Sequence, residues 1–298
     1  MGIVVVGSVA LDNVITPYGK NFNAPGGSAS YFSLSASYFT KVKLVAVVGD
    51  DFPTKYIRFF NKKGIDTSGL EIKKGKTFRW KGRYDLSFDN PQTLETHLNL
   101  FKDFRPALPP DYRDERIVFL ANIDPDLQLE VLKQTKPTLS AADTISLWIE
   151  HKRKSLLEVL GRIDVFIINE HEARQLTKEP NLLKAGKRII SYGVDKVIIK
   201  KGENGLLYFT KKSFVICPAY LLENIKDPTG AGDTFAGGFL GYLASRKKRD
   251  EKAFKRALIY GSVMASFVVE HYDIKAHNRL NRRMIEQRAL AFKHICSL

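Results

Sequence analysis

The chain has 298 residues, of which 44% are hydrophobic and 11% aromatic, so it can bury a large core and is neither disordered nor fibrous. No apolar run approaches the roughly 18 residues of a membrane-spanning helix, and the two cysteines suit a reducing cytoplasm better than a disulfide framework or metal knuckle. The net charge of +15 would suit nucleic-acid binding, but the basic residues are scattered and carry no such motif, so a lysine-rich solvated surface is favoured.

Short apolar runs alternate with helical patterns along most of the chain. Continuous apolar strands separated by helices are typical of a parallel sheet covered on both faces. The strand candidates are residues 3–6, 42–48, 117–120, 138–142, 165–168 and 197–199, and the helix candidates between them are residues 56–63, 126–134, 155–160 and 182–192. We therefore expect an α/β three-layer sandwich with a mostly parallel central sheet flanked by helices.

Two segments, about 12–25 and 70–104, depart from this pattern because polar and aromatic residues alternate along them. Alternation of this kind is typical of half-exposed strands. We expect a small β-sheet that projects from the sandwich as a lid, and the lid is also a candidate homodimer contact. No linker separates independent units, so residues 1–298 are expected to form one domain.

The last third of the chain is predicted to be helical over residues 229–245, 251–272 and 281–295. The middle helix has a run of small side chains that includes Ala257, Gly261 and Ala265. Small residues on one stretch allow close packing against another helix, or leave space for an adenine ring. The sequence leaves both interpretations open.

The strongest chemical signal is the segment 227–233, Asp-Pro-Thr-Gly-Ala-Gly-Asp, which runs directly into a predicted helix. Free amide groups and the helix dipole make a helix N-terminus an anion site, and small residues let the anion approach the backbone. Asp233 would lie in the first helical turn beside that anion. A carboxylate there can accept a proton from a hydroxyl that attacks phosphorus.

This segment resembles the C-terminal signature of the ribokinase-like sugar kinases, the PfkB carbohydrate kinase family, and the resemblance covers nearly the whole chain. It implies the sandwich-and-lid fold and the transfer of phosphate from ATP. It also implies that Asp233 is the catalytic base and that the amides of Gly230, Ala231 and Gly232 form the anion hole.

Other motifs of this family can be compared with the chain one by one. Asp12, after the first strand, resembles the aspartate that binds acceptor hydroxyls, and Gly26 and Gly27 resemble the glycine pair that approaches the substrate. Asn169 and Glu172 resemble the Asn-x-x-Glu motif, which implies that Glu172 orients hydrated Mg²⁺ and the phosphates. Read on their own, Asn169 and Glu172 also form a helix-capping pair.

The turn after residues 197–199 resembles the nucleotide-side turn of the family. Lys200 would meet the phosphates there, and Gly202 and Gly205 would let the backbone pass the nucleotide. A basic β-turn without a ligand is the alternative interpretation.

The chain departs from ribokinase in two places. Tyr31 stands where ribokinase has an asparagine that reads ribose, and residues 267–273 lack the Gly-Ala segment of potassium-dependent members. Free ribose is therefore disfavoured as a substrate, and dependence on K⁺ is left open.

The lid strand 78–84 places Phe78, Trp80 and Tyr84 on one face. These rings either stack on a nucleobase, with Trp80 as the binding residue, or pack on the sandwich or a partner.

We accordingly expect a cytoplasmic kinase that uses ATP and Mg²⁺ to phosphorylate a nucleoside, with an adenosine-type acceptor favoured over a sugar. It is not expected to bind nucleic acid or a membrane. A sugar-phosphate kinase would need a basic lid residue such as Arg79 or Arg83. A nucleic-acid-binding protein or a silent scaffold on the same fold would not require the base that Asp233 provides.

Overall fold

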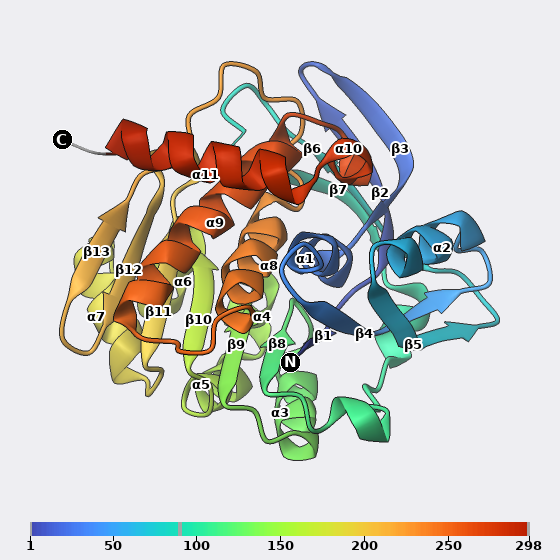
Figure 1. The fold of residues 1–298 in the computed structure, drawn as a ribbon. Coiled ribbons are helices and arrows are strands. Elements are labelled where there is room, and N and C mark those ends of the chain that lie inside the picture. The colour runs from blue at the N-terminus through green and yellow to red at the C-terminus, as the bar shows by residue number, and fades with distance from the viewer. Residues whose placement is uncertain (1, 89–90, 297–298) are drawn as a thin grey trace.

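The computed structural model describes residues 2–88 and 91–296. Among them, nine strands form one large sheet: β1 (Gly2–Val6), β4 (Lys41–Gly49), β5 (Ile65–Lys73), β8 (Ile117–Leu120), β9 (Leu139–Asp143), β10 (Val165–Asn169), β11 (Lys196–Lys200), β12 (Leu206–Thr210) and β13 (Phe214–Cys217). Their order is β13-β12-β11-β10-β9-β8-β1-β4-β5 (Figure 1). All neighbours from β11 to β5 are parallel, and β12 and β13 add an antiparallel hairpin at one edge.

Helices cover both faces of this sheet. One face is covered by α1 (Ser28–Ala36), α2 (Thr54–Lys62), α8 (Ala231–Ala244) and α9 (Glu251–Val269), and α11 (Arg282–Cys296) lies on α9 and completes the core on this side. The other packs against α3 (Pro125–Gln134), α4 (Ser146–His151), α5 (Arg153–Leu160), α6 (Glu170–Thr177) and α7 (Leu182–Ser191). Strand β1 shows the reason, because Ile3 and Val5 belong to the first core while Val4 and Val6 belong to the second. The predicted three-layer sandwich is confirmed.

Four short 3₁₀ segments and one short helix complete the described elements: η1 (Asn99–Asp103), η2 (Pro110–Tyr112), η3 (Gly202–Asn204), η4 (Asp273–Lys275) and α10 (Ala276–Arg279). No described helix has the combination of length and hydropathy that crossing a bilayer requires.

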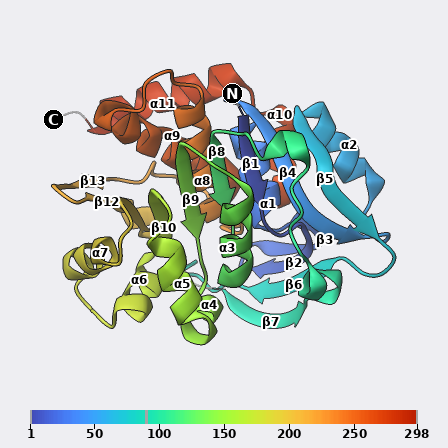
Figure 2. The same cartoon turned by 90° about the horizontal axis from the view of Figure 1, so that it is seen from below.

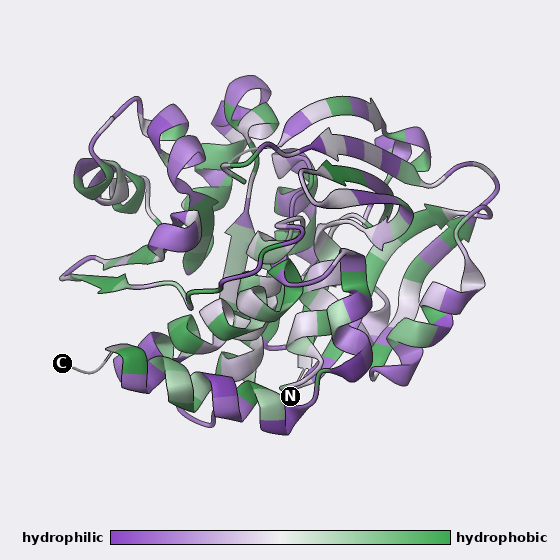
Figure 3. Ribbon diagram, turned by 90° about the horizontal axis from the view of Figure 1, so that it is seen from above, coloured by the Kyte–Doolittle hydropathy of each residue, from purple (hydrophilic) through white to green (hydrophobic). Residues whose placement is uncertain are grey.

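Four further strands form a separate small sheet: β2 (Ala10–Thr16), β3 (Gly19–Gly26), β6 (Phe78–Arg83) and β7 (Gln92–His97), in the order β3-β2-β6-β7. Figure 2 shows these four strands side by side, and Figure 3 shows bands of hydrophilic and hydrophobic residues along them. Because β2 follows β1 after only three residues, the small sheet starts at the carboxyl end of β1, an interior strand of the large sheet.

The large sheet also contains strands that were not predicted, namely β5, β12 and β13. Strand β5 has the sequence Ile-Asp-Thr-Ser-Gly-Leu-Glu-Ile-Lys and lies at the sheet edge, so it lacks the continuous apolar run of a central strand. Residues 70–73 therefore belong to the large sheet, and the small sheet resumes at Phe78.

Helix α8 is wedged between α1 and α9. A side-chain carbon on Gly237 would meet the Phe32 carbonyl and the Ser35 side chain of α1, and one on Gly238 would lie 2.8 Å from the Tyr260 carbonyl of α9. A carbon on Gly261 would likewise lie 3.0 Å from the Phe235 carbonyl. Close helix packing, one of the two interpretations of the small residues in α9, is thus present, and it fixes the helix into which the signature runs.

Candidate active site

The signature segment forms a tight turn at the start of α8. Gly230 is the N-cap, with φ of 75°, a left-handed conformation that glycine adopts without steric cost. A side chain there would also collide with the ring of Tyr31 in α1. The turn therefore requires glycine. The Ala231 amide donates to the Pro228 carbonyl at 3.0 Å, whereas the helix start directs the amides of Gly232 and Asp233 outward.

Lys200 lies at the same helix end. Its ammonium group occupies the place that a side-chain carbon on Gly232 would take. Helix amides and a lysine ammonium thus converge on one point, which is a suitable environment for a phosphoryl group that carries negative charge. The two sequence-predicted features, the anion hole at 230–232 and Lys200, are brought together by the fold.

Asp233 lies in the first turn of α8 beside Lys200 and is partly open to solvent. Burial by the surrounding groups raises the pKa of Asp233 to about 6, and the positive charge of Lys200 opposes this rise. A carboxylate with a pKa near 6 is mostly ionised at neutral pH and still accepts a proton readily, as a general base must.

A second carboxyl group, Asp143, interacts with Asp233 and was not singled out from the sequence. It ends strand β9 and is 6% exposed. Burial and the neighbouring Asp233 charge raise the pKa of Asp143 well above its usual range, whereas the hydrogen bond between the two groups lowers the pKa of Asp233. The directions of these shifts favour Asp143 as the hydrogen-bond donor and Asp233 as the acceptor.

The place of Asp143 in the sequence indicates that it ends a strand. It directly follows an apolar run, as Asn169 follows residues 165–168 and Lys200 follows residues 197–199. The strands β9, β10 and β11 are adjacent and parallel, with Asn169 paired in register with Lys200. Polar residues that end adjacent parallel strands meet at one edge of a sheet, where α/β proteins place their ligands.

The predicted capping pair at the start of α6 is present. The Glu172 amide donates to Asn169 Oδ1 at 2.8 Å, and the Asn169 amide donates to Glu172 Oε2 at 3.0 Å. Burial raises the pKa of Glu172, and Lys200 opposes the rise. Glu172 thus shares the electrostatic environment of Lys200 and Asp233 while it caps the helix.

The glycines after Lys200 shape the turn that leads to β12. Gly202 begins η3 with φ of 55°, and Gly205 follows it with φ of 79°. The space beside Gly202 is open, whereas Gly205 packs against the backbone of residues 217 and 218. Their contact with a nucleotide stays a prediction.

Asp12 forms the opposite end of the site, on strand β2. Its carboxylate lies directly against Gly26, where a side-chain carbon would overlap Oδ2, and it accepts a hydrogen bond from the Gly27 amide. Burial raises the pKa of Asp12 to about 7, the Gly27 amide opposes this, and the charges of Asp227 and Asp233 add to the rise. The predicted acceptor residues are therefore one cluster within electrostatic reach of the predicted base.

Two tyrosines enter this region and were not predicted as site residues. The Tyr84 hydroxyl, at the end of lid strand β6, lies 3.5 Å from Thr229 Oγ1 of the signature. Tyr31 packs its ring on Gly230. Burial raises the pKa of both hydroxyls, and the charges of Asp227 and Asp12 raise them further. Both tyrosines therefore stay neutral and can donate hydrogen bonds to the acidic groups or to a ligand.

Trp80 lies on the same side of the small sheet as Asp12, because the two residues are paired in register across β6 and β2. The indole is half-buried, donates to Thr93 Oγ1 at 3.3 Å, and covers Gly82. Part of its surface is thus packed within the lid.

Residues 3–278 match the family described as pfkB family carbohydrate kinase. Among relatives, a cytidine kinase of Thermococcus kodakarensis is 33% identical over 83% of this chain and 90% of that protein. A nucleoside kinase of Methanocaldococcus jannaschii is 29% identical over 76% of this chain and 73% of the relative.

Solved structures have the same fold. The Methanocaldococcus jannaschii nucleoside kinase, described as an archaeal member of the ribokinase family, aligns with a TM-score of 0.78 at 23% identity, over 97% of this chain and 98% of that one. A putative ribokinase II from E. coli, in complex with ATP and Mg²⁺, aligns with a TM-score of 0.80 at 18% identity, over 97% and 99% of the two chains.

A sheet-edge site with a helix N-terminus, a lysine and a carboxylate base suits phosphoryl transfer to a hydroxyl. The chain belongs to the pfkB family of carbohydrate kinases. It is an ATP-dependent phosphotransferase, and its acceptor is a hydroxyl group of a nucleoside or a sugar.

Proposed function

We propose that the acceptor is a nucleoside and that the lid recognises its base. The observation that carries this proposal is the position of Tyr84, a lid ring that reaches Thr229 of the signature while lying within electrostatic reach of Asp12. Trp80 adds a second ring on the side of the sheet that bears Asp12. Aromatic faces bind bases by stacking, and two relatives are named cytidine kinase and nucleoside kinase.

In this proposal the nucleoside sugar binds at Asp12, Gly26 and Gly27, and its attacking hydroxyl points to Asp233. Asp233 takes the proton as the hydroxyl attacks the γ-phosphorus of ATP, and the bond between that phosphorus and the bridging oxygen breaks to release ADP. Asp143 holds the base in place by donating a hydrogen bond to it. The amides of Gly230 and Gly232 and the Lys200 ammonium stabilise the charge on the transferring phosphoryl oxygens, whereas the Ala231 amide is bonded to the Pro228 carbonyl.

We propose Mg²⁺ as the accompanying cation. Within residues 2–88 and 91–296, no three acidic, histidine or cysteine side chains cluster closely enough to hold a metal by themselves. Mg²⁺ typically takes one or two carboxylates together with water and substrate phosphates. The buried Glu172, which lies in the electrostatic environment of Lys200 and Asp233, fits such a site. When bound there, Mg²⁺ would neutralise charge on the phosphates.

The sugar-phosphate alternative receives less support. Arg79, one of its two candidate phosphate-binding residues, is bonded to Asp51 and Asn23, and Arg83 is exposed. A phosphate on the acceptor would therefore have to displace an existing ion pair or bind an exposed arginine.

The test is a panel of acceptors assayed by ADP release: cytidine, adenosine, uridine, guanosine, ribose, fructose and fructose 6-phosphate. We expect the nucleosides to have the highest kcat/KM. A higher kcat/KM for cytidine would agree with the relative named cytidine kinase, and a higher kcat/KM for adenosine would agree with the acceptor that the sequence favours. An Asp233→Asn control establishes that the activity comes from this site. Activity on sugars alone would contradict the proposal.

A further inference from the structure

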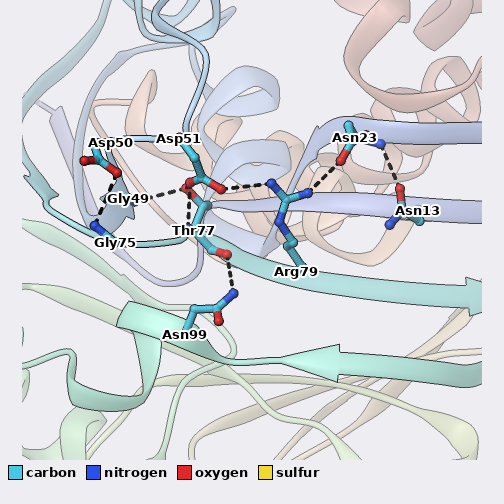
Figure 4. Close-up of polar contacts among 9 residues, drawn as sticks. All are labelled: Asn13, Asn23, Gly49, Asp50, Asp51, Gly75, Thr77, Arg79 and Asn99. Carbon is cyan, nitrogen blue, oxygen red and sulfur yellow. Dashed lines mark hydrogen bonds and ion pairs between the residues drawn. The ribbon is translucent and has the colours of Figure 1, made fainter.

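The segment that links β5 to β6 crosses from the large sheet to the small sheet. It passes over Gly49, where a side-chain carbon would meet the backbone of residues 75–77. Thr77 is fully buried, and its hydroxyl donates to Asp51 Oδ1 at 2.6 Å and accepts from the Gly49 amide at 3.0 Å. The crossing is therefore fixed to the turn that follows β4 (Figure 4).

Arg79 extends this attachment to the other side of the lid. Its Nη2 atom donates to Asp51 Oδ2 at 2.9 Å, and its Nη1 atom donates to Asn23 Oδ1 at 2.6 Å. Figure 4 shows the guanidinium between these two side chains. Arg79 of β6 thus joins Asp51, in the turn that follows β4, to Asn23 of strand β3.

Asn23 lies in a bulge of the β2–β3 hairpin. Asp12 pairs with Ala24 and Val14 pairs with Asn21, so Phe22 and Asn23 together oppose the single residue Asn13. Asn23 has φ of 51°, and its amide donates to Asn13 Oδ1 at 2.8 Å. Bulges redirect the strand that follows them. The strand that follows this bulge is the one that carries Gly26 and Gly27 to Asp12.

We propose that Arg79 is a positioning residue for the acceptor site, which fixes the bulge at Asn23 relative to Asp51 and so sets the position of Gly26 and Gly27 against Asp12. The proposal rests on binding of the acceptor at Asp12, as in the proposed function, but on no particular acceptor. The side chains of Arg79 and Asp51 are 29% and 27% exposed, respectively. Pairs at such sites contribute little to stability, so the main effect of the contact is on geometry. The planar arginine fork fixes the directions of the two bonds relative to each other, which a rotating lysine ammonium does not.

Lys81 provides a matched control. It lies two residues along β6 and pairs with Glu95 at 2.6 Å, a contact wholly within the small sheet. We compare Arg79→Met with Lys81→Met in steady-state kinetics with the best acceptor of the panel. Arg79→Met is expected to raise the acceptor KM about tenfold, as small misplacements of bound groups do, and to leave the ATP KM within about twofold. Lys81→Met is expected to change neither. Equal acceptor KM values in the two variants would overturn the proposal.

Asn23→Gly tests the same contact from its other end, because glycine keeps the positive φ and removes only the side chain. We expect it to raise the acceptor KM as Arg79→Met does, and we expect the double variant to be no worse than Arg79→Met alone. Effects that multiply would show that the two residues act separately and would refute the proposal.

Hydrogen exchange makes the test independent of the acceptor. We expect amides of residues 19–27 to exchange faster in Arg79→Met than in Lys81→Met, with melting temperatures that agree. If the wild type phosphorylates no nucleoside, the proposed function fails while this comparison still stands. Identical exchange in the two variants would argue against a positioning role.

Discussion

The two sides of the site are held in different ways. On the phosphoryl side, Asp143, Asn169 and Lys200 end buried parallel strands, and α8 is wedged between two helices at glycine contacts. On the acceptor side, a four-stranded sheet is attached through polar contacts such as Arg79–Asp51, which are partly exposed.

A second polar attachment holds the far end of the lid. Asn21 donates to Asp273 Oδ2 at 2.8 Å, and the Thr16 hydroxyl lies 3.1 Å from that of Tyr272. The Asp273 amide in turn bonds the Asp227 carboxylate of the signature. Densely packed elements hold reacting groups in fixed geometry, whereas regions attached by exposed polar contacts open more easily. We infer that the packed core holds the reacting groups, whereas a few polar contacts hold the sheet that carries the proposed acceptor residues.

The sharpest separation of the two sides comes from Asp233→Asn. We expect kcat to fall by on the order of 10²–10⁴-fold, because the general base is lost, while ATP affinity changes little. Turnover and ATP binding are measured on the same preparation, with Asp195→Asn, a surface aspartate paired with Lys211, as the control. Near-normal turnover in Asp233→Asn would remove the base from this residue.

Gly232→Ala tests the phosphoryl side without changing a charge. The backbone of Gly232 is helical, so alanine fits it, but the added carbon would occupy the place of the Lys200 ammonium. We expect kcat/KM for ATP to fall about ten- to a hundredfold, in line with the loss of one charge-stabilising group, and Gly232→Val to be worse. Circular dichroism and the melting temperature establish that the variant is folded. Full activity would place the phosphate elsewhere.

Much of the phosphoryl side could be predicted from the sequence because local motifs determine it. Asp233 directly follows the turn at 230–232. Asn169 and Glu172 are three residues apart, and they follow an apolar run that predicts a strand. Asp143 shows the limit. Its place after an apolar run indicates a strand end, but its role depends on its contact with Asp233 at the N-terminus of α8, which is distant in the sequence.

The acceptor side was harder because its contacts join distant segments. Tyr84 meets Thr229, Tyr31 meets Gly230, and Arg79 meets both Asp51 and Asn23. Alternation in the lid indicated a shared face for Trp80 and Tyr84 but not which ring enters the site. Edge strand β5 was missed for a related reason, because half-exposed strands have weak hydrophobic patterns.

Replacing the lid rings Trp80 and Tyr84 one at a time tests whether each ring binds the acceptor. Loss of a stacked ring weakens base binding by about 1–3 kcal/mol, so Trp80→Ala or Tyr84→Ala should raise the nucleoside KM roughly ten- to a hundredfold. The ATP KM should not change. Phe214→Ala, an exposed ring on the edge strand β13, is the control. An unchanged nucleoside KM in both variants would leave these rings as packing.

The smallest effect expected is a shift in the pH profile. Because the pKa of Asp233 is raised to about 6, kcat/KM should rise with pH through that value as the base ionises and then level off. Asp143 lowers the pKa of Asp233 by donating a hydrogen bond, so Asp143→Leu should move this acid limb to higher pH, by up to about one unit for the loss of one hydrogen bond. Asp143→Asn retains a donor and should leave the limb nearly in place. The shift is measured from profiles of kcat/KM between pH 5 and pH 8 for the wild type, Asp143→Leu and Asp143→Asn, in mixed buffers of constant ionic strength. A limb that moves to lower pH in Asp143→Leu would mean that Asp143 is ionised and repels the charge of Asp233, and the roles of the two carboxyl groups would then have to be exchanged.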